Sequence, residues 1–225
     1  MNNDHDVAAL ESVSFAKNYN KYVLELFLPN IDESKHILDF GAGYGLMCEA
    51  IKKFGLKISS LEINPKAIKK LEAREIKNYL DFNDIDEKID CIISLNVLEH
   101  LDDDNSYIKK FYEFLPDNGK LVLYLPSSQI IWSNLDDLVN HKRRYSKKGL
   151  EKLLVSNNFK IQKIYFVDFI GWSVLLLSKL LNLRLDFDQK KIIFYDKFIF
   201  KSFKFFDILF KNLIGKNLFV VATKS

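Results

Sequence analysis

The 225-residue sequence has few cysteines, and those it has form no metal-binding pattern. Cys48 and Cys91 belong to no Cys-x-x-Cys pair and to no cluster of cysteine and histidine. Cys91 lies within an apolar run, which favours a buried thiol. The first residues, MNNDHD, lack the apolar stretch of a secretory signal peptide. We therefore expect a reducing, cytoplasmic setting.

Long hydrophobic runs are also absent. The nearest candidate, Phe169 to Ser178, is bounded by Asp168 and Lys179 and has about half of the roughly 18–20 apolar residues that a transmembrane helix needs. Apolar residues still make up 48% of the chain, which is enough for a full-sized core. We expect one domain with an appendage, preceded by a polar tail at Met1 to Asp6.

A strong net charge is missing too, because the formal charge is only +3. This value gives no case for nucleic acid as a partner. The basic residues are nevertheless unevenly placed, since residues 169–217 hold nine Lys or Arg against four Asp. Either a compositional bias or a purposeful basic surface explains this local excess.

Apolar patterns predict strands that alternate with helices. The expected strands are 36–40, 57–62, 76–82, 89–95, 120–125, 159–167 and 218–223, and the expected helices are 14–28, 46–54, 65–75, 105–115 and 146–156. This order predicts an α/β fold with a Rossmann-like, doubly wound, seven-stranded sheet. The sheet is mostly parallel with an antiparallel last strand, and a helical insert precedes that strand. We expect a main domain at residues 1–168 with 218–225 and the insert at 169–217.

The strongest motif is a glycine turn, Gly41-Ala-Gly-Tyr-Gly45, between an expected strand and an expected helix. In such sheets this turn lies at the carboxyl ends of the strands, where ligands bind. Leu46 breaks the dinucleotide spacing Gly-x-Gly-x-x-Gly. Asp39 before the turn suits a cationic amine better than a pyrophosphate. Glu62 ends the next strand, where a carboxylate can accept hydrogen bonds from ribose hydroxyls.

These motifs together resemble a known family. Asp39-Phe-Gly-Ala-Gly-Tyr-Gly45 with Glu62-Ile-Asn-Pro65 is similar to the S-adenosylmethionine (SAM) site of class I methyltransferases. Ile92-Ile-Ser-Leu-Asn-Val-Leu-Glu-His-Leu101 resembles the fourth-strand motif of their ubiquinone-methyltransferase-like branch. Asp137-Leu-Val-Asn-His-Lys-Arg-Arg-Tyr145 and Gly215-Lys-Asn-Leu-Phe219 resemble signatures of a bacterial subgroup that accompanies glycosyltransferase and cell-surface polysaccharide genes.

Three positions depart from the subgroup's pattern. Asn140 replaces its glycine before the histidine, Asn217 replaces its serine, and Asp117-Asn-Gly119 replaces the usual Gly-Gly turn. None of them touches the glycine turn. They weaken the assignment of the methyl acceptor more than that of the cofactor.

The resemblance implies a role for each matching residue, with SAM as the cofactor. The turn glycines would let the methionine part pass over the backbone, Asp39 would face its amine, and Asn96 would lie beside it. Glu62 would hold the ribose. The other predicted cofactor-binding residues are Ile63, Asp81 and Phe82 around the adenine and Tyr19, on an N-terminal helix, above the site.

Methyl transfer from a sulfonium is an in-line displacement, so an oxygen acceptor of high pKa also needs a base. His141 and Asp137 are the predicted catalytic residues: either could be the base, and Asp137 could instead orient His141. Arg143, Arg144 and Tyr145 are predicted to grip an anionic group of the substrate, or else form a surface cluster where a helix begins. For His100, a structural hydrogen-bonding role is favoured. No carboxylate cluster indicates a required metal.

The insert admits several interpretations. Ile192 to Ile214 is rich in Phe and interleaved with lysines. It could wall the acceptor pocket as a lid, form a dimer surface, lie on anionic lipid as an interfacial helix, or pack as ordinary core. The oligomeric state stays open.

The predicted function is a SAM-dependent methyl transfer, expected at an oxygen of a small-molecule or glycan-type acceptor. One alternative is a nicotinamide-dependent oxidoreductase, which Leu46 argues against. The other is a non-catalytic scaffold or membrane-surface protein, which the retained glycines and Glu62 argue against.

Overall fold

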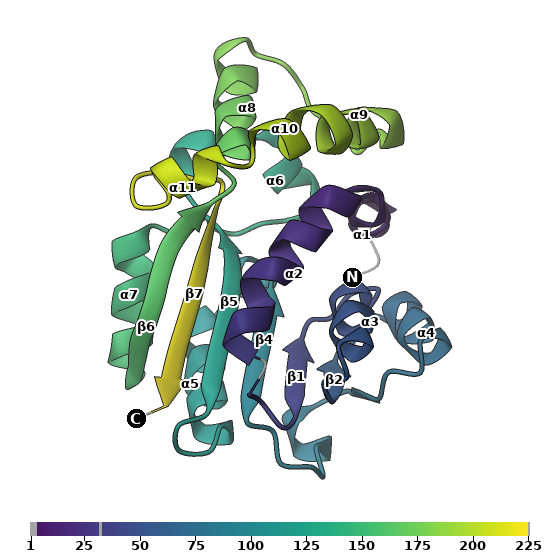
Figure 1. Cartoon of the computed structure of the whole chain (residues 1–225), viewed down its shortest axis with the longest axis vertical. Coiled ribbons are helices and arrows are strands. Elements are labelled where there is room, and N and C mark those ends of the chain that lie inside the picture. Colours follow the sequence, from purple (N-terminus) through teal and green to yellow (C-terminus); the bar gives the residue numbers. More distant parts are fainter. Residues whose placement is uncertain (1–3, 32, 225) are drawn as a thin grey trace.

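A computed structural model describes residues 4–31 and 33–224 of the chain. Its centre is a seven-stranded sheet in the order β3-β2-β1-β4-β5-β7-β6, with helices packed around it (Figure 1). The strands are β1 Ile37–Phe40, β2 Ile58–Leu61, β3 Asn78–Tyr79, β4 Cys91–Leu95, β5 Lys120–Pro126, β6 Phe159–Val167 and β7 Asn217–Lys224. The predicted Rossmann-like fold is confirmed.

Strand direction and order locate the ligand-binding edge. β1 pairs in parallel with β2 on one side and with β4 on the other, whereas β7 runs antiparallel to both β5 and β6. The chain therefore adds β2 and β3 on one side of β1 and then crosses to the other side of β1 to form β4. Ligands of open α/β sheets bind at such a switch point, beyond the carboxyl ends of the strands.

Helices bury the two faces of this sheet. They are α2 Lys17–Ile31, α3 Leu46–Lys53, α4 Pro65–Ala73, α5 Asp104–Phe114 and α7 Lys147–Ser156. Phe111 of α5 packs with Leu38 on one face, and Phe27 of α2 packs with Ile37 on the other. Asn64 caps α4, and Pro65 occupies its first turn, as the sequence indicates.

The N-terminal segment differs from the prediction in two respects. Helix α1, Asp4–Phe15, replaces the second half of the expected polar tail at Met1 to Asp6, whose first three residues lie outside the described residues. Leu10 of α1 packs on the glycine turn, and this contact was not visible in the sequence. Helix α2 also continues to Ile31 past Pro29, because a proline in the last turn removes only one helical hydrogen bond.

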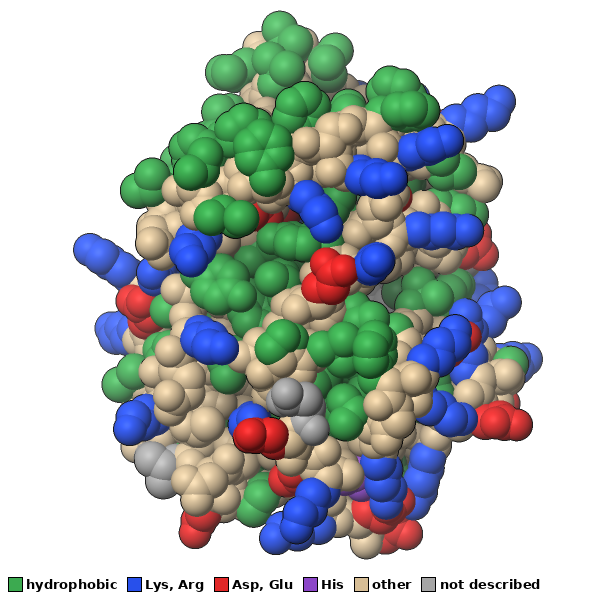
Figure 2. All heavy atoms as spheres, in the orientation of Figure 1, with side chains coloured by type: hydrophobic (Ala, Val, Ile, Leu, Met, Phe, Trp, Pro, Cys, Tyr) green, Lys and Arg blue, Asp and Glu red, His purple; other side chains and the backbone are tan. Residues whose placement is uncertain are grey.

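Residues 169–216 form a helical cap beyond the end of β6 and the start of β7. It contains α8 Phe169–Leu180, α9 Gln189–Phe194, the π-helical segment η4 Tyr195–Phe200, α10 Lys201–Phe203 and α11 Phe206–Phe210 (Figure 1). Hydrophobic side chains, with Lys and Arg beside them, gather over this end of the molecule (Figure 2). Within the described residues, every helix is too short or too polar to cross a bilayer.

Candidate active site

The glycine turn has a backbone that other residues would strain. Gly41, Gly43 and Gly45 have φ of 76°, 53° and 72°, in the region that favours glycine. A Cβ on Gly41 would lie 2.4 Å from a Val97 methyl, and one on Gly43 would lie 2.8 Å from Leu10. The chain therefore passes closely under α1 and against the residues that follow β4.

Asp39 at the end of β1 is a buried carboxylate with an unused acceptor. Its side chain is 1% exposed, Oδ2 accepts a hydrogen bond from Cys48 Sγ at 3.2 Å, and Oδ1 has no partner among the described residues. Burial, with a smaller contribution from Glu62, raises the pKa of Asp39 to about 7 despite the Cys48 hydrogen bond. A buried acceptor without a donor destabilises the protein, and a ligand ammonium group would satisfy it.

Glu62, directly after β2, ties the second strand to the glycine turn. Its Oε2 accepts the N–H of Gly43, and its Oε1 accepts the N–H groups of Ile63 and Asn64, each at 2.8 Å. A carboxylate offers about four acceptor positions, so Oε2 keeps one for a further donor. Ile63 lies beside it with 73% of its surface exposed.

The other predicted cofactor-binding residues lie on neighbouring strand ends. Asn96 follows β4 as an exposed residue with φ of 52°. Asp81 is exposed and caps the short 3-10 helix η1, Phe82–Asp84. The ring of Phe82 is 7% exposed and packs in the core. The Tyr19 hydroxyl lies at the ends of β5 and β7, 2.7 Å from the Tyr124 hydroxyl.

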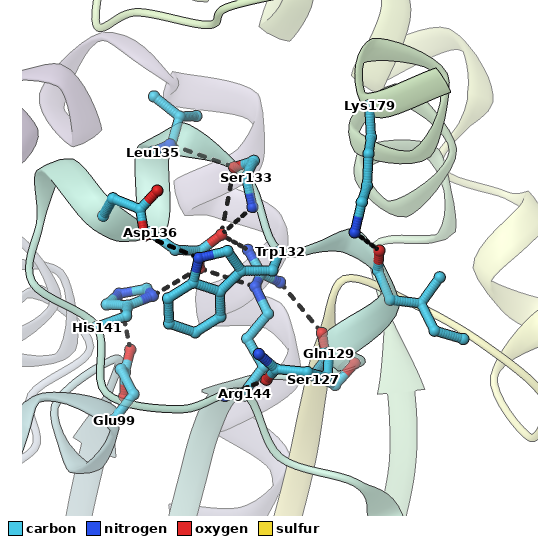
Figure 3. Close-up of polar contacts among 12 residues, drawn as sticks. Glu99, Ser127, Gln129, Trp132, Ser133, Leu135, Asp136, His141, Arg144 and Lys179 are labelled. Carbon is cyan, nitrogen blue, oxygen red and sulfur yellow. Dashed lines mark hydrogen bonds and ion pairs between the residues drawn. The ribbon is translucent and has the colours of Figure 1, made fainter. Parts of the chain in front are cut away.

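The loop after β5 is built around a second buried carboxylate, Asp136 (Figure 3). It is 1% exposed and hydrogen-bonds to His141 Nδ1 at 2.8 Å, to Arg144 Nε at 2.8 Å and to Arg144 Nη2 at 3.1 Å. Burial acts to raise the pKa of Asp136, but the His141 hydrogen bond and the Arg144 charge outweigh it and hold that pKa at about 2. Asp136 is therefore an ionised, fully partnered acid.

The sequence suggested that Asp137 could orient His141, but Asp136 makes that contact. Ser133 caps helix α6, Asn134–Leu138, and Asp136 is the third residue of its capping box, which turns this carboxylate inward. Asp137 lies about 100° further round the helix. It is exposed and accepts a hydrogen bond from Trp132 Nε1 at 2.9 Å. The Ser-x-x-Asp spacing was the signal in the sequence that could have identified Asp136.

Glu99 is a functional candidate that the sequence did not single out. It lies in the 3-10 helix η2, Leu98–His100, fully buried, with neither carboxylate oxygen hydrogen-bonded to a described residue. Oε1 lies 3.7 Å from Nε2 of His141 (Figure 3). Burial raises the pKa of Glu99 to about 8. Burial and the proximity of His141 lower the pKa of His100 to about 4. The ligand atoms of Glu99, His100 and His141 lie within 4.8 Å of one another, close enough to surround one small polar group or cation.

The three predicted substrate-binding side chains already have partners in the chain. Arg143 pairs with Asp104 at 2.8 Å, and the Tyr145 hydroxyl donates to the same carboxylate at 2.6 Å. Arg144 is held by Asp136, as described above. These contacts fix the loop against the start of α5, and the substrate role of the three side chains stays a prediction.

The structure accounts for the departures from the subgroup's motif. Asn140 and Asn118 have φ of 55° and 63°, so asparagine keeps the left-handed backbone that glycine adopts easily. Asn217 is 3% exposed, and its Nδ2 donates to the hydroxyls of Tyr19 and Tyr124, each at 3.0 Å. At Asn118 and Asn140 the backbone is therefore one that glycine would also adopt, and Asn217 has a hydrogen-bonding role of its own.

Residues 13–164 match the family model of a methyltransferase domain. The chain belongs to the methyltransferase domain family. It is 31% identical over 97 residues to the ubiquinone biosynthesis O-methyltransferase of Chelativorans sp. (strain BNC1), covering 39% of this chain and 38% of that protein. It is 28% identical over 110 residues to the enzyme of the same name from Bartonella quintana (strain Toulouse), covering 44% of each. The chain thus matches about two fifths of the length of these curated relatives.

Solved methyltransferase structures align with most of the chain. A SAM-dependent methyltransferase from Archaeoglobus fulgidus aligns with a TM-score of 0.63 and 20% identity, covering 91% of this chain and 92% of that one. A putative S-adenosylmethionine-dependent methyltransferase from Listeria monocytogenes aligns with a TM-score of 0.61 and 14% identity, covering 93% and 98%. At these identities the likeness shows that the chain shares the fold of SAM-dependent methyltransferases.

Proposed function

We propose that this protein transfers the methyl group of SAM to an oxygen atom of a small-molecule or glycan-type acceptor. The observation that carries the donor assignment is the unpartnered Oδ1 of buried Asp39, beside a glycine turn that Glu62 holds through Gly43. Membership of the methyltransferase domain family supports the same donor. The acceptor class rests on the resemblance of the Asp137–Tyr145 segment to its subgroup.

The protein's own groups fit the parts of SAM. In this proposal Asp39 binds the amine of the methionine part, the free position on Glu62 Oε2 binds a ribose hydroxyl, and exposed Ile63 covers the adenine. When bound, SAM supplies an activated methyl on a sulfonium whose sulfur leaves uncharged and needs no acid. The chain's main contribution is then to hold the reacting atoms in line.

His141 is the proposed proton acceptor. Asp136 binds its Nδ1, which fixes the tautomer with the lone pair on Nε2. Nε2 lies 3.7 Å from Glu99, whose raised pKa keeps that carboxyl neutral at pH 7. With Nδ1 bound to Asp136, Nε2 is the ring nitrogen that can take a proton from an acceptor hydroxyl. Exposed Asp137 is the second candidate.

The fold alone does not determine which kind of atom accepts the methyl group. Proteins of this fold are named as a phosphoethanolamine N-methyltransferase of Haemonchus contortus and a geranyl diphosphate C-methyltransferase of Streptomyces coelicolor. Oxygen is favoured here because an imidazole with a fixed tautomer suits deprotonation of a hydroxyl. The curated relatives are named O-methyltransferases, which supports the same choice.

Thermal unfolding with and without ligand tests the donor, and turnover tests the acceptor. We expect millimolar S-adenosylhomocysteine to raise the melting temperature while NADH leaves it unchanged. Release of S-adenosylhomocysteine is then measured with nucleotide sugars, lipid-linked sugars and phenols. A shift with NADH alone would favour the oxidoreductase alternative. Ligand binding without turnover on any acceptor would favour a non-catalytic scaffold.

A further inference from the structure

The insert at residues 169–217 exposes an unusual amount of apolar surface. Of the eighteen large hydrophobic side chains that are exposed in the described part of the chain, twelve lie between Leu177 and Leu213. They include Phe194 (57% exposed), Phe198 (54%), Phe205 (54%) and Leu209 (65%). Figure 2 shows hydrophobic side chains spread over this end of the molecule. A patch that is not packed in the chain's own core marks an interaction surface.

The acids of the insert are distributed unequally between its two sides. Asp196 is 3% exposed and accepts the backbone N–H groups of Asn18 and Tyr19 at 2.9 and 2.8 Å, at the start of α2. Asp207 is 7% exposed and accepts those of Asp168 and Phe169 at 2.8 and 2.7 Å, at the start of α8. Two of the insert's four acids therefore cap helices in the interior and contribute no charge to its surface.

The cations of the insert remain at the surface. Lys190, Lys197 and Lys201 are exposed on the helical run from Gln189 to Phe203, and each lacks an ion-pair partner among the side chains that the structure describes, those of residues 10–31 and 33–224. Lys197 Nζ lies 5.3 Å from the ring of its neighbour Phe198. Exposed rings and exposed ammonium groups are thus interleaved on one side of this run, while Asp196 and Phe200 face the interior.

We propose that this outer face, defined by Phe194, Phe198, Phe205 and Leu209 with Lys190, Lys197 and Lys201, binds the surface of an anionic lipid bilayer. Aromatic and aliphatic side chains enter the boundary between headgroups and acyl chains, and lysines meet the lipid phosphates. A second copy of the chain is a poorer partner, because a two-fold interface would bring two equally basic faces together. The proposal does not depend on methyl transfer.

Vesicle flotation of the full chain tests this proposal. We expect binding to vesicles of phosphatidylcholine and phosphatidylglycerol in equal parts, little binding to phosphatidylcholine alone, and weakening as salt is added. Phe194→Ser with Phe198→Ser should abolish binding. Lys190→Gln, Lys197→Gln and Lys201→Gln should each lower the partition coefficient about fivefold. Matched controls are Phe54→Ser (Phe54 is 61% exposed) and Lys109→Gln on α5, far from the insert in sequence.

The outcomes separate the proposal from its competitors. Equal losses in the control variants, or equal binding to both kinds of vesicle, would overturn it. So would an absence of vesicle binding with a concentration-dependent dimer that Phe194→Ser and Phe198→Ser disrupt, which would assign the face to a second copy. S-adenosylhomocysteine binding by each variant reports that the fold and the donor site are intact, so failure here is distinct from failure of the proposed function.

Discussion

Two equally buried aspartates of the candidate site, Asp39 and Asp136, have different surroundings. On the donor side, Asp39 keeps one carboxylate oxygen without a donor, and burial raises its pKa to about 7. On the side of the β5 loop, Asp136 is equally buried but has His141 and Arg144 as partners, and its pKa is about 2. An unsatisfied acid marks a position that a ligand completes, whereas a satisfied one holds the scaffold.

The largest effect on turnover is expected for replacement of His141, the proposed base, which Asp136 holds in place. Replacement by Asn keeps an amide donor near Asp136 but removes the base. We expect kcat to fall about 10²- to 10⁴-fold, with S-adenosylhomocysteine affinity unchanged. Steady-state turnover with an acceptor from the panel measures this change. If Asp137→Asn caused the larger loss of kcat instead, Asp137 and not His141 would be the base.

Removal of Asp136 should mainly destabilise the fold. Asp136→Ala leaves the Arg144 guanidinium, whose side chain is 6% exposed, without its counter-charge. We expect a loss of about 3–5 kcal/mol in the free energy of unfolding. Urea denaturation measures it, and Asp137→Ala, one residue away and exposed, is the matched control with a loss of about 0.5 kcal/mol or less. Equal losses in both variants would show that burial of the pair is not what stabilises the loop.

Asp39→Asn should have opposite effects on binding and stability. Loss of the charge weakens S-adenosylhomocysteine binding roughly 10- to 100-fold, because a charge-assisted hydrogen bond to the amine becomes a neutral one. Titration calorimetry measures this decrease. Unchanged affinity would show that Asp39 does not contact the ligand.

The same variant should also change how stability depends on pH. The carboxyl has a pKa near 3.8 when unfolded and about 7 when native, so the native state binds an extra proton between these values. Wild-type stability therefore falls as pH rises through this window, whereas that of Asp39→Asn does not. Urea denaturation should show the variant gaining relative stability from pH 4 to pH 8. A constant difference would contradict the raised native pKa.

The smallest effect concerns Asn140, which keeps a left-handed φ of 55°. Asn140→Gly should change the free energy of unfolding by less than about 0.5 kcal/mol, because glycine adopts this backbone freely. Asn140→Ala should destabilise by about 1–2 kcal/mol, because its Cβ is strained there. Thermal unfolding of both variants checks this. Equal stability of the two would show that the loop does not depend on the left-handed conformation.

Local patterns predicted most of the fold. Strand and helix positions followed from apolar periodicity, and the Asn64-Pro65 cap marked where α4 begins. The glycine turn and Glu62 could also be singled out from the sequence, because they are near in sequence and follow neighbouring strands.

Contacts between distant segments were not predictable in this way. Asp196 caps α2 from 178 residues away, and nothing near Asn18 in the sequence indicates it. Glu99 was missed because its burial beside His141 depends on how the loop after β5 folds back on η2. Which of two adjacent acids faces His141 was set by the rotation of α6 from its Ser133 cap.

A crystal structure grown with S-adenosylhomocysteine tests the central claim most directly. The account predicts electron density at the ends of β1 and β2, with the ligand's amine on Asp39 Oδ1 and a ribose hydroxyl on Glu62 Oε2. Density elsewhere in the molecule, or an empty glycine turn at saturating ligand, would contradict it.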